Sequence, residues 1–224
     1  MRPAAPARAT ATVRVPSDAL EGGDPSAYGR PVDAVVIGAS AGGVEALMRI
    51  LTAFTPRLPI PVFVVVHLPR DRPSLLAKIF AVHCAVPVRE AEDKMPAEPG
   101  TIYFAPPDYH LLLDRGPALA LSADEAVNYS RPSIDVLFET AADVYGARLA
   151  GVVLTGANHD GAAGLAAIHR AGGVTIVQDP ETALADAMPN AALRSTEADF
   201  VLPLDGIREL LQMVDGAMDR RPRS

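Results

Sequence analysis

Val35-Val36-Ile37-Gly38-Ala39-Ser40-Ala41-Gly42-Gly43 is the stretch of sequence that decides the fold. Its first residues are β-branched and apolar, which predicts a buried strand. A glycine-rich turn follows, and then apolar residues recur at helical spacing through position 54. A strand, a tight turn and a helix hold one small side chain, here Ser40, at the carboxyl end of the strand. Gly38, Ser40 and Gly42 also fit the G-x-S-x-G pattern of nucleophilic serines, so Ser40 is a candidate nucleophile.

The alternation of strands and helices continues along the rest of the chain. We expect buried strands at 61–66, 86–88, 149–154, 173–177 and 200–202, and helices at 74–80, 134–145, after Gly164 and at 207–214. Short apolar runs at 101–104, 110–113 and 118–121 predict pieces of antiparallel hairpins. The prediction is therefore an α/β fold: a doubly wound, mostly parallel sheet with helices on both faces and an antiparallel hairpin as an insertion or edge.

The composition narrows the class of protein. The chain has 224 residues, of which 49% are hydrophobic, and this is enough for one domain with a substantial core. Its net charge of −7 argues against general nucleic-acid binding, which requires a basic face. We expect no membrane insertion, because no apolar stretch approaches the roughly 20 residues of a membrane-spanning helix. Cys84 is the only cysteine, which fits a reducing cytoplasm, and we expect it to fill core space.

The expected domain occupies residues 31–218. Residues 1–30 are rich in Ala, Pro and Arg and contain no acidic residue before Asp18. This composition favours a disordered tail over a transit peptide. Residues 219–224 are expected to form a short C-terminal tail.

Polar residues follow two other predicted strands. His67 ends the strand at 61–66, and Asp160 lies in the loop after the strand at 149–154. The carboxyl ends of parallel strands share one edge of a sheet, so Ser40, His67 and Asp160 are expected to lie together. A serine hydroxyl needs an imidazole to remove its proton, and the imidazole needs a carboxylate to orient it. These three residues thus predict a Ser-His-Asp triad.

Further residues are candidates for the loops that bind the substrate or the oxyanion. The backbone N–H of Ala41 follows the serine at a helix N-terminus, where it is suited to stabilise negative charge. Met188 precedes a proline in a predicted loop that we assign to the same edge. The full set of these candidates is Ala41, Gly42, Gly43, Asn158, His159 and Met188.

Each feature also has a simpler explanation. Glycine-rich turns bind phosphates and dinucleotides, although a dinucleotide site should have an acidic residue where this chain has His67. His67 alone is compatible with a structural histidine, and Asp160 with a cap on the helix that follows it. Metal-ligand residue types occur around Asp108 and His159, but no third and fourth ligand stand at zinc-like spacing. We therefore expect no metal and no cofactor.

With these residues in place, the chain resembles the CheB protein-glutamate methylesterase family. The resemblance covers about residues 32–211 and rests on ordered motifs at 37–43 (IGASAGG), 67–69 (HLP), 103–106 (YFAP), 131–138 (RPSIDVLF), 154–156 (LTG) with 160–162 (DGA), and 187–189 (AMP).

The resemblance implies a catalytic mechanism and a partner. Ser40 would be the nucleophile, His67 the general base and Asp160 the carboxylate that orients it. The implied reaction is hydrolysis of glutamate γ-methyl esters on chemoreceptor-like signalling helices, with glutamine deamidation as a related activity. A nucleotide-binding module built on residues 38–43, and a non-catalytic module that docks on receptor helices, are the alternatives.

The sequence departs from the family pattern in several ways. The loop at 156–161 reads GANHDG, where GMGNDG is common, and Ala41 replaces a frequent threonine. The residues before Val32 are too few for the phospho-receiver domain usual in the family. We therefore expect a stand-alone catalytic domain, with a separate regulatory protein in trans as a further expected partner.

Overall fold

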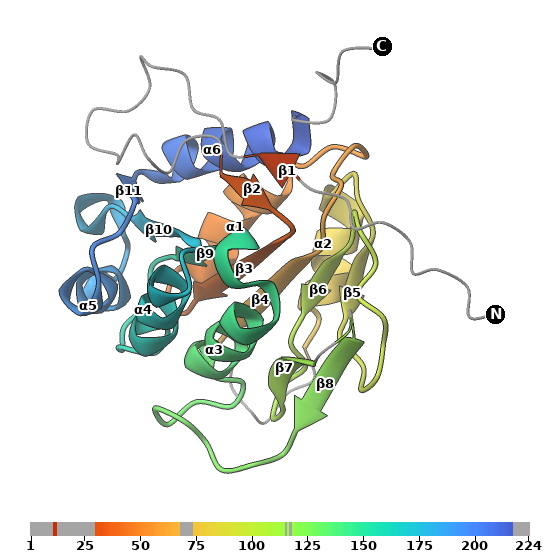
Figure 1. Ribbon diagram of the computed structural model, residues 1–224, viewed down its shortest axis with the longest axis horizontal. Helices are drawn as coiled ribbons and strands as arrows, with labels where there is room; N and C mark the ends of the chain where they lie inside the picture. Colours follow the sequence, from red (N-terminus) through yellow and green to blue (C-terminus); the bar gives the residue numbers. More distant parts are fainter. Residues whose placement is uncertain (1–10, 13–29, 68–73, 115, 117, 217–224) are drawn as a thin grey trace.

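The computed structural model describes residues 11–12, 30–67, 74–114, 116 and 118–216, and in this part the chain forms a parallel α/β sheet (Figure 1). The 7-stranded sheet has the order β11-β10-β9-β3-β4-β6-β5, and every neighbouring pair is parallel. Its strands are β3 (Ala34–Ala39), β4 (Val62–Val66), β5 (Val88–Glu90), β6 (Ile102–Phe104), β9 (Leu149–Val153), β10 (Val174–Gln178) and β11 (Phe200–Leu202).

The strand order reverses between β3 and β9. From β3 the chain builds outward through β4 to β6 and β5, and it then returns to the other side of β3 with β9. Ligand sites of open α/β sheets lie at the carboxyl ends of the strands beside such a reversal. We therefore expect the functional site to lie at the loops that follow β3 and β9.

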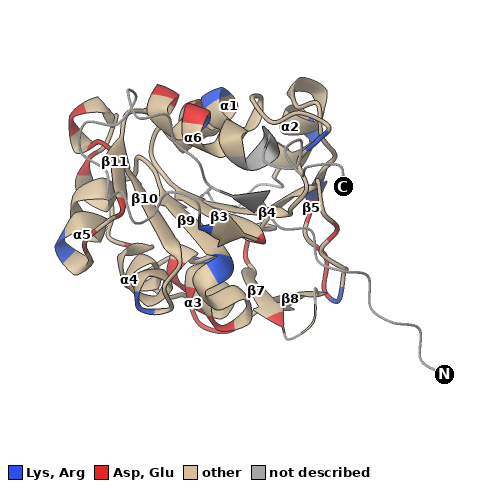
Figure 2. Cartoon of the chain, turned by 45° about the horizontal axis from the view of Figure 1, so that its top comes forward, with Lys and Arg blue, Asp and Glu red and all other residues tan. Residues whose placement is uncertain are grey.

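Helices cover both faces of the sheet (Figure 2). The residues of one core layer come from α1 (Gly43–Leu51), α2 (Leu76–His83) and α6 (Leu204–Gly216), and those of the other from α3 (Ile134–Tyr145), α4 (Ala162–Arg170) and α5 (Ala187–Ser195). Short 3-10 turns, η2 (Gly146–Arg148) and η3 (Pro180–Thr182), precede β9 and α5. Antiparallel pairs are formed by β1 (Ala11–Thr12) with β2 (Pro31–Val32) and by β7 (His110–Asp114) with β8 (Ala118–Ser122).

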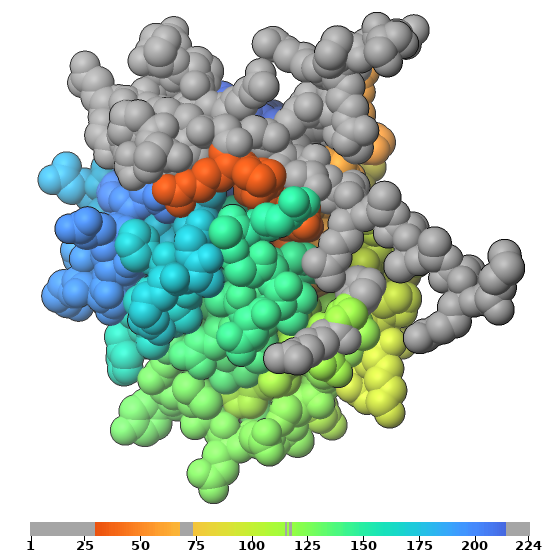
Figure 3. All heavy atoms as spheres, in the orientation of Figure 1, coloured from red at the N-terminus to blue at the C-terminus, as the bar shows by residue number. Residues whose placement is uncertain are grey.

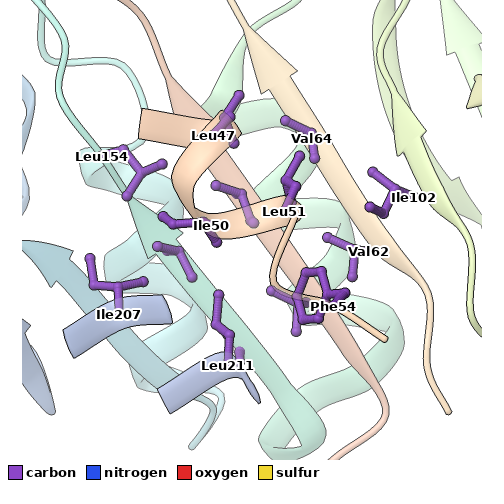
Figure 4. Packing of buried hydrophobic residues seen from close by; sticks show 14 of the residues in the cluster. Leu47, Ile50, Leu51, Phe54, Val62, Val64, Ile102, Leu154, Ile207 and Leu211 are labelled. Atoms are coloured by element: carbon purple, nitrogen blue, oxygen red, sulfur yellow. The ribbon is translucent and has the colours of Figure 1, made fainter. Parts of the chain in front are cut away.

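The core layer beneath α1 consists of apolar side chains. Leu47 and Leu51 of α1 point into the layer above Val62 and Val64 of β4, and Ile207 of α6 closes its side (Figure 4). All of these side chains are completely buried. Each contributes about 1.5–3 kcal/mol relative to an exposed position, so this layer fixes the start of α1 firmly against the sheet.

On the opposite face, α3 approaches β3 closely at Gly38. A Cβ placed on Gly38 would collide with the Cγ2 atom of Ile134, the first residue of α3. Glycine therefore permits the N-terminus of α3 to lie directly over the end of β3. This contact brings the first turn of α3 to the edge of the sheet that carries Ser40.

The predicted fold class is confirmed, including the β7–β8 hairpin, but two local predictions are wrong. Residues 102–104 form β6, a parallel strand inside the main sheet, because the whole segment is buried and buried parallel strands are continuously apolar. Met188 lies in the first turn of α5 instead of a loop, since proline at the next position is tolerated at a helix start.

The predicted tails fall almost entirely outside the described residues. Within those residues, none of the helices combines the length and the apolar character needed to cross a bilayer. Lys and Arg are scattered among the described elements in Figure 2.

Candidate active site

Ser40 and His67 follow neighbouring strands at the same edge of the sheet. The register pairs Ala39 with Val66, and the N–H of His67 donates to the carbonyl of Ala39 at 3.2 Å. Neighbouring strands lie about 4.8 Å apart, so residues 40 and 67 are lateral neighbours. Because side chains alternate along a strand, both are expected to face the side on which α3 lies.

The imidazole of His67 contacts the carboxylate of Asp160. The distance from His67 Nε2 to Asp160 Oδ2 is 2.8 Å, and the Asp160 side chain is fully buried while 13% of the His67 side chain is exposed. An ionised carboxylate only accepts hydrogen bonds, so Nε2 carries the proton in this contact. The other ring nitrogen, Nδ1, is then the one available to accept a proton.

Asn158 lies against that second ring nitrogen. Its Nδ2 atom is 3.3 Å from His67 Nδ1, and its Oδ1 atom accepts the N–H of Asp160 at 3.1 Å, which sets the orientation of the amide. Within the described residues, no hydrogen bond joins the Ser40 hydroxyl to the ring. In this structure, therefore, the Asn158 amide donates to His67 Nδ1. This is the nitrogen that has to accept the proton of a serine nucleophile.

The carboxylate of Asp160 caps α3. It accepts the N–H of Ile134 at 2.7 Å, the N–H of Asp135 at 3.1 Å and the hydroxyl of Ser133 at 2.8 Å. The helix that follows Asp160, α4, begins at Ala162, and its N-cap residue is Gly161 and not Asp160. The simpler explanation of Asp160 as a cap of the next helix is therefore wrong, because its bonds go to a helix earlier in the chain.

These bonds determine the charge state of Asp160. Burial by itself raises the pKa of this carboxyl, but hydrogen bonds from His67, Asn128, Ile134 and Ser133 outweigh it and leave the pKa below its ordinary value. Asp160 is therefore ionised at neutral pH. An ionised, fully bonded carboxylate is suited to stabilise a positive charge on His67.

The N-terminus of α1 remains open. Gly42 has φ = 77° and no side chain caps the helix. The N–H of Gly43 donates to the carbonyl of Ser40 at 2.8 Å, whereas no hydrogen bond among the described residues uses the N–H of Ala41 or Gly42. Thr155 Oγ1 donates to the carbonyl of Ala41 at 2.8 Å and so holds the turn. The N–H groups of Ala41, the predicted donor, and of Gly42 are thus open to an anion, and that of Gly43 is not.

Met188 forms a buried wall beside the serine. Its N–H donates to the carbonyl of Gly156 at 2.9 Å, and its side chain is 1% exposed. A Cβ placed on Gly156 would collide with the Sδ atom of Met188 and lie 2.9 Å from the Cβ of Ser40. Met188 therefore packs behind the site, and Gly156 leaves room for both neighbours.

His159 lies on the outer side of the site. It is exposed and lines a groove of about 320 Å³ together with Asn128, Asp135 and Arg194. Within the described residues, no group of three or more His, Cys, Asp and Glu side chains is arranged to hold a metal ion.

Several residues of this network were missed by the sequence reasoning. Asn128 bonds to Asp160 at 3.0 Å, and Ser133 and Asp135 bond to the same carboxylate. Ser133 and Asp135 belong to the motif at 131–138, and a serine that opens a helix is a recognisable signal. Asn128 stands in an irregular segment, where no periodic pattern marks it.

Cys84 lies away from this network. It packs against the α1-side core, and burial raises the pKa of its thiol to about 11. Few thiolates form at neutral pH under these conditions, so Cys84 is not a competing nucleophile.

Over most of its length, the chain is similar to known proteins of one family. The model of the CheB methylesterase family matches residues 35–211. A Leptospira interrogans protein, to which protein-glutamate methylesterase/protein-glutamine glutaminase activity is provisionally assigned, is 45% identical over 82% of this chain and 95% of its own length. The protein-glutamate methylesterase/protein-glutamine glutaminase 2 of Caulobacter vibrioides is 38% identical over 92% of this chain and 59% of its own length.

A solved structure is also similar to this chain. The catalytic domain of the Thermotoga maritima CheB methylesterase superposes with a TM-score of 0.77 at 33% identity, over 82% of this chain and 98% of that domain. The likeness therefore extends over nearly the whole of a catalytic domain.

Proposed function

The chain belongs to the CheB methylesterase family, and we propose that it hydrolyses γ-methyl esters of glutamate on chemoreceptor-type signalling helices with Ser40 as nucleophile. The family and the relatives make it a carboxylic ester hydrolase of the protein-glutamate methylesterase/glutaminase type. The observation that supports the roles within the site is the 2.8 Å contact between His67 and Asp160 beside Ser40.

The proposed reaction proceeds through an acyl-enzyme. Ser40 Oγ attacks the ester carbonyl while His67 Nδ1 takes up the hydroxyl proton, and Asp160 stabilises the imidazolium that forms. The tetrahedral intermediate collapses, the bond to the methoxy group breaks, and the imidazolium returns its proton to release methanol. A water molecule then attacks the acyl-serine by the same route and leaves glutamate and free Ser40.

The oxyanion of the tetrahedral intermediate forms next to the open start of α1. We assign its stabilisation to the N–H groups of Ala41 and Gly42, which have no other partner among the described residues. The partial positive charge of the helix N-terminus adds to these hydrogen bonds. Asn158 has to release Nδ1 when Ser40 turns toward it, so its 3.3 Å contact belongs to the resting enzyme.

Deamidation of glutamine is the proposed second activity. It uses the same attack and the same acyl-enzyme, with ammonia as the leaving group. The expected location is the cytoplasm, which the single Cys84 favours. A separate regulatory protein acting in trans remains a proposed partner.

Methanol release from a methylated receptor cytoplasmic fragment tests this proposal. We expect Ser40→Ala to lower the rate about 10⁴-fold or more, since the members of a triad act as a unit. Ser122→Ala, on the edge hairpin, is the matched control and should retain the wild-type rate. Methanol release by Ser40→Ala at the control rate would exclude Ser40 as the nucleophile.

Labelling with a fluorophosphonate separates the enzyme from a non-catalytic docking module. The proposal requires the probe to react with Ser40 in the wild-type chain and not in Ser40→Ala. A chain that binds the receptor fragment but neither reacts with the probe nor releases methanol would be a docking module instead.

A further inference from the structure

A single side-chain amide joins two buried carboxylates behind the candidate site. Asn128 Nδ2 donates to Asp135 Oδ2 at 2.7 Å and to Asp160 Oδ1 at 3.0 Å. A primary amide nitrogen carries two hydrogens, so each carboxylate receives one of them. Asn128 is thus bonded to Asp160 on the side opposite His67 and acts on the ring only through that carboxylate.

The two carboxylates lie close together because each one caps the other's helix. Asp160, which precedes α4, accepts the N–H groups at the start of α3, whereas Asp135, in the first turn of α3, accepts the N–H of Gly164 in α4 at 2.7 Å. Only 6% of Asp135 and 1% of Asp160 is exposed. This exchange binds the two helices together, but it also brings like charges together in a buried place.

Few positively charged side chains lie near Asp135 and Asp160 to reduce the repulsion between their carboxylates. Burial raises the pKa of Asp135, the charge of Asp160 raises it further, and the bonds from Gly164 and Asn128 oppose both effects. Glu139 and Asp143 continue the negative stripe along α3, and the pKa of Glu139 is raised by burial and by these neighbours, with only Arg170 opposing.

On the other elements, His67 faces Asp160 directly, and His159 and Arg194 line the outer groove. Within the described residues, no Lys or Arg forms an ion pair with Asp135 or Asp160. The donors to the two carboxylates are therefore neutral groups, and Asn128 is the donor that they share.

The loop around Asn128 is built to present this amide. Asn128 has φ = 51°, a left-handed conformation that asparagine tolerates better than most residues. Arg131 anchors the loop through Asp108 Oδ1 at 2.7 Å and the carbonyl of Ala123 at 2.7 Å. Figure 3 shows the segment around residue 125, in green, projecting at the lower edge of the molecule.

We propose that Asn128 is a positioning residue for Asp160, which holds the Asp160 carboxylate in place by bridging it to Asp135. The proposal rests on the proposed function for its effect on rate, but not for its effect on the carboxylates themselves. Without the amide, the two carboxylates face each other with no common donor. The bond from Asn128 lowers the pKa of both carboxyls, so its loss raises both pKa values, and Asp160 loses its charge at a higher pH than in the wild-type chain.

Asn128→Gly is the test variant, because glycine adopts the positive φ of this position and removes only the amide. We expect kcat to fall about 10- to 100-fold, as for loss of a hydrogen bond to a charged group, with KM little changed. The loss should be greatest at low pH. The titration of Asp160 can be followed by the carboxyl ¹³C signals of Asp-labelled protein, with the Asp160 signal assigned by its loss in Asp160→Asn. The titration midpoint of the Asp160 carboxyl, called the Asp160 midpoint below, should move to higher pH.

Three further variants make the test specific. Asn128→Asp keeps the shape but adds a third negative charge, so it should shift the midpoint more than Asn128→Gly does. Tyr129→Gly, at the neighbouring position with φ = 61°, should leave the midpoint at its wild-type value. In Asn128→Gly combined with Asp135→Asn the second charge is gone, and the midpoint should return toward the wild-type value.

If Asn128→Gly does not fold, Asn128→Ser, which keeps one donor, should give an intermediate shift. The inference is overturned if the Asp160 midpoint and the pH profile of kcat are unchanged, or if kcat falls equally at every pH with an unchanged midpoint. The carboxyl titration needs no substrate. A chain that releases no methanol but shows the shift would therefore retain this inference and lose the proposed function.

Discussion

The helices α1 and α3 begin at the same edge of the sheet, but their N-termini are used in opposite ways. The start of α1 has no side-chain cap and leaves the N–H groups of Ala41 and Gly42 without a partner among the described residues. The start of α3 is filled by the Asp160 carboxylate, which accepts two of its N–H groups and the Ser133 hydroxyl.

The difference follows from the kind of negative charge that each helix N-terminus stabilises, which is transient at α1 and permanent at α3. In acyl transfer, negative charge exists only during the reaction, so its donors must be free beforehand. The positive charge on the base needs a permanent counter-charge, and a helix N-terminus keeps a carboxylate ionised even when it is buried. One helix start therefore provides a vacant anion site, and the other holds an anion in place.

Among the variants that test the two helix starts, Asp160→Asn should have the largest effect, because it removes the permanent charge at α3. An asparagine can keep some of the capping bonds, but it cannot stabilise an imidazolium. We expect kcat for methanol release to fall about 10³- to 10⁴-fold.

The same variant has a second readout in stability. The pKa of Asp160 is lowered on folding, so its contribution is present above the ordinary value of about 3.9 and is lost as the pH falls below it. The difference in unfolding free energy between wild type and Asp160→Asn should therefore shrink in acid. A difference that stayed constant from pH 7 to pH 3 would contradict the capping role of the charge.

Gly42→Ala should have an intermediate effect, because it disturbs the vacant site at α1. A side chain at φ = 77° costs about 1–2 kcal/mol, and the new Cβ would lie 2.8 Å from Cδ2 of Leu184. Since the N–H groups of the turn move with this strain, we expect kcat to fall about 10- to 100-fold, less than for complete loss of a donor.

The control for this variant is Gly116→Ala, at φ = 107° with no atom within 4 Å of the new Cβ. It should lower the melting temperature through backbone strain alone and leave kcat unchanged. Equal losses of activity in both variants would mean that stability, and not the open turn, is responsible.

Ser133→Ala should have the smallest effect, because it removes one of several donors to Asp160. The carboxylate keeps its bonds from His67, Asn128 and the α3 backbone. We expect a loss of about 1 kcal/mol in stability and a few-fold lower kcat in the methanol assay. A loss as large as that of Asp160→Asn would show that Ser133 has a role of its own in the chemistry.

Sequence periodicity predicted the helices and strands, which depend on residues close together in the chain. The strand–turn–helix unit around Ser40 and most other elements follow from spacings of two and of three to four residues. The same spacing rules failed for residues 102–104, because a short buried strand has no alternation that distinguishes its neighbours.

The part of the site that could not be predicted is held by non-local bonds. Asp160 bonds to residues 25 to 32 positions earlier, and a residue before a helix suggests a cap for that helix only. Asn128 lies in a loop, so nothing in its own surroundings indicates that it joins two carboxylates. Such partners become visible only when α3 and α4 are seen side by side.

The exchange of caps between α3 and α4 also has a consequence for biosynthesis. Ser40 and His67 are translated first, and Asp160 follows His67 by 93 positions. A nascent chain that has made the nucleophile and the base still lacks the acid, as well as the helix pair that orients it. Hydrolytic competence should therefore emerge in a single late step, when the second helix docks, and truncated or partly folded chains should be inert toward esters.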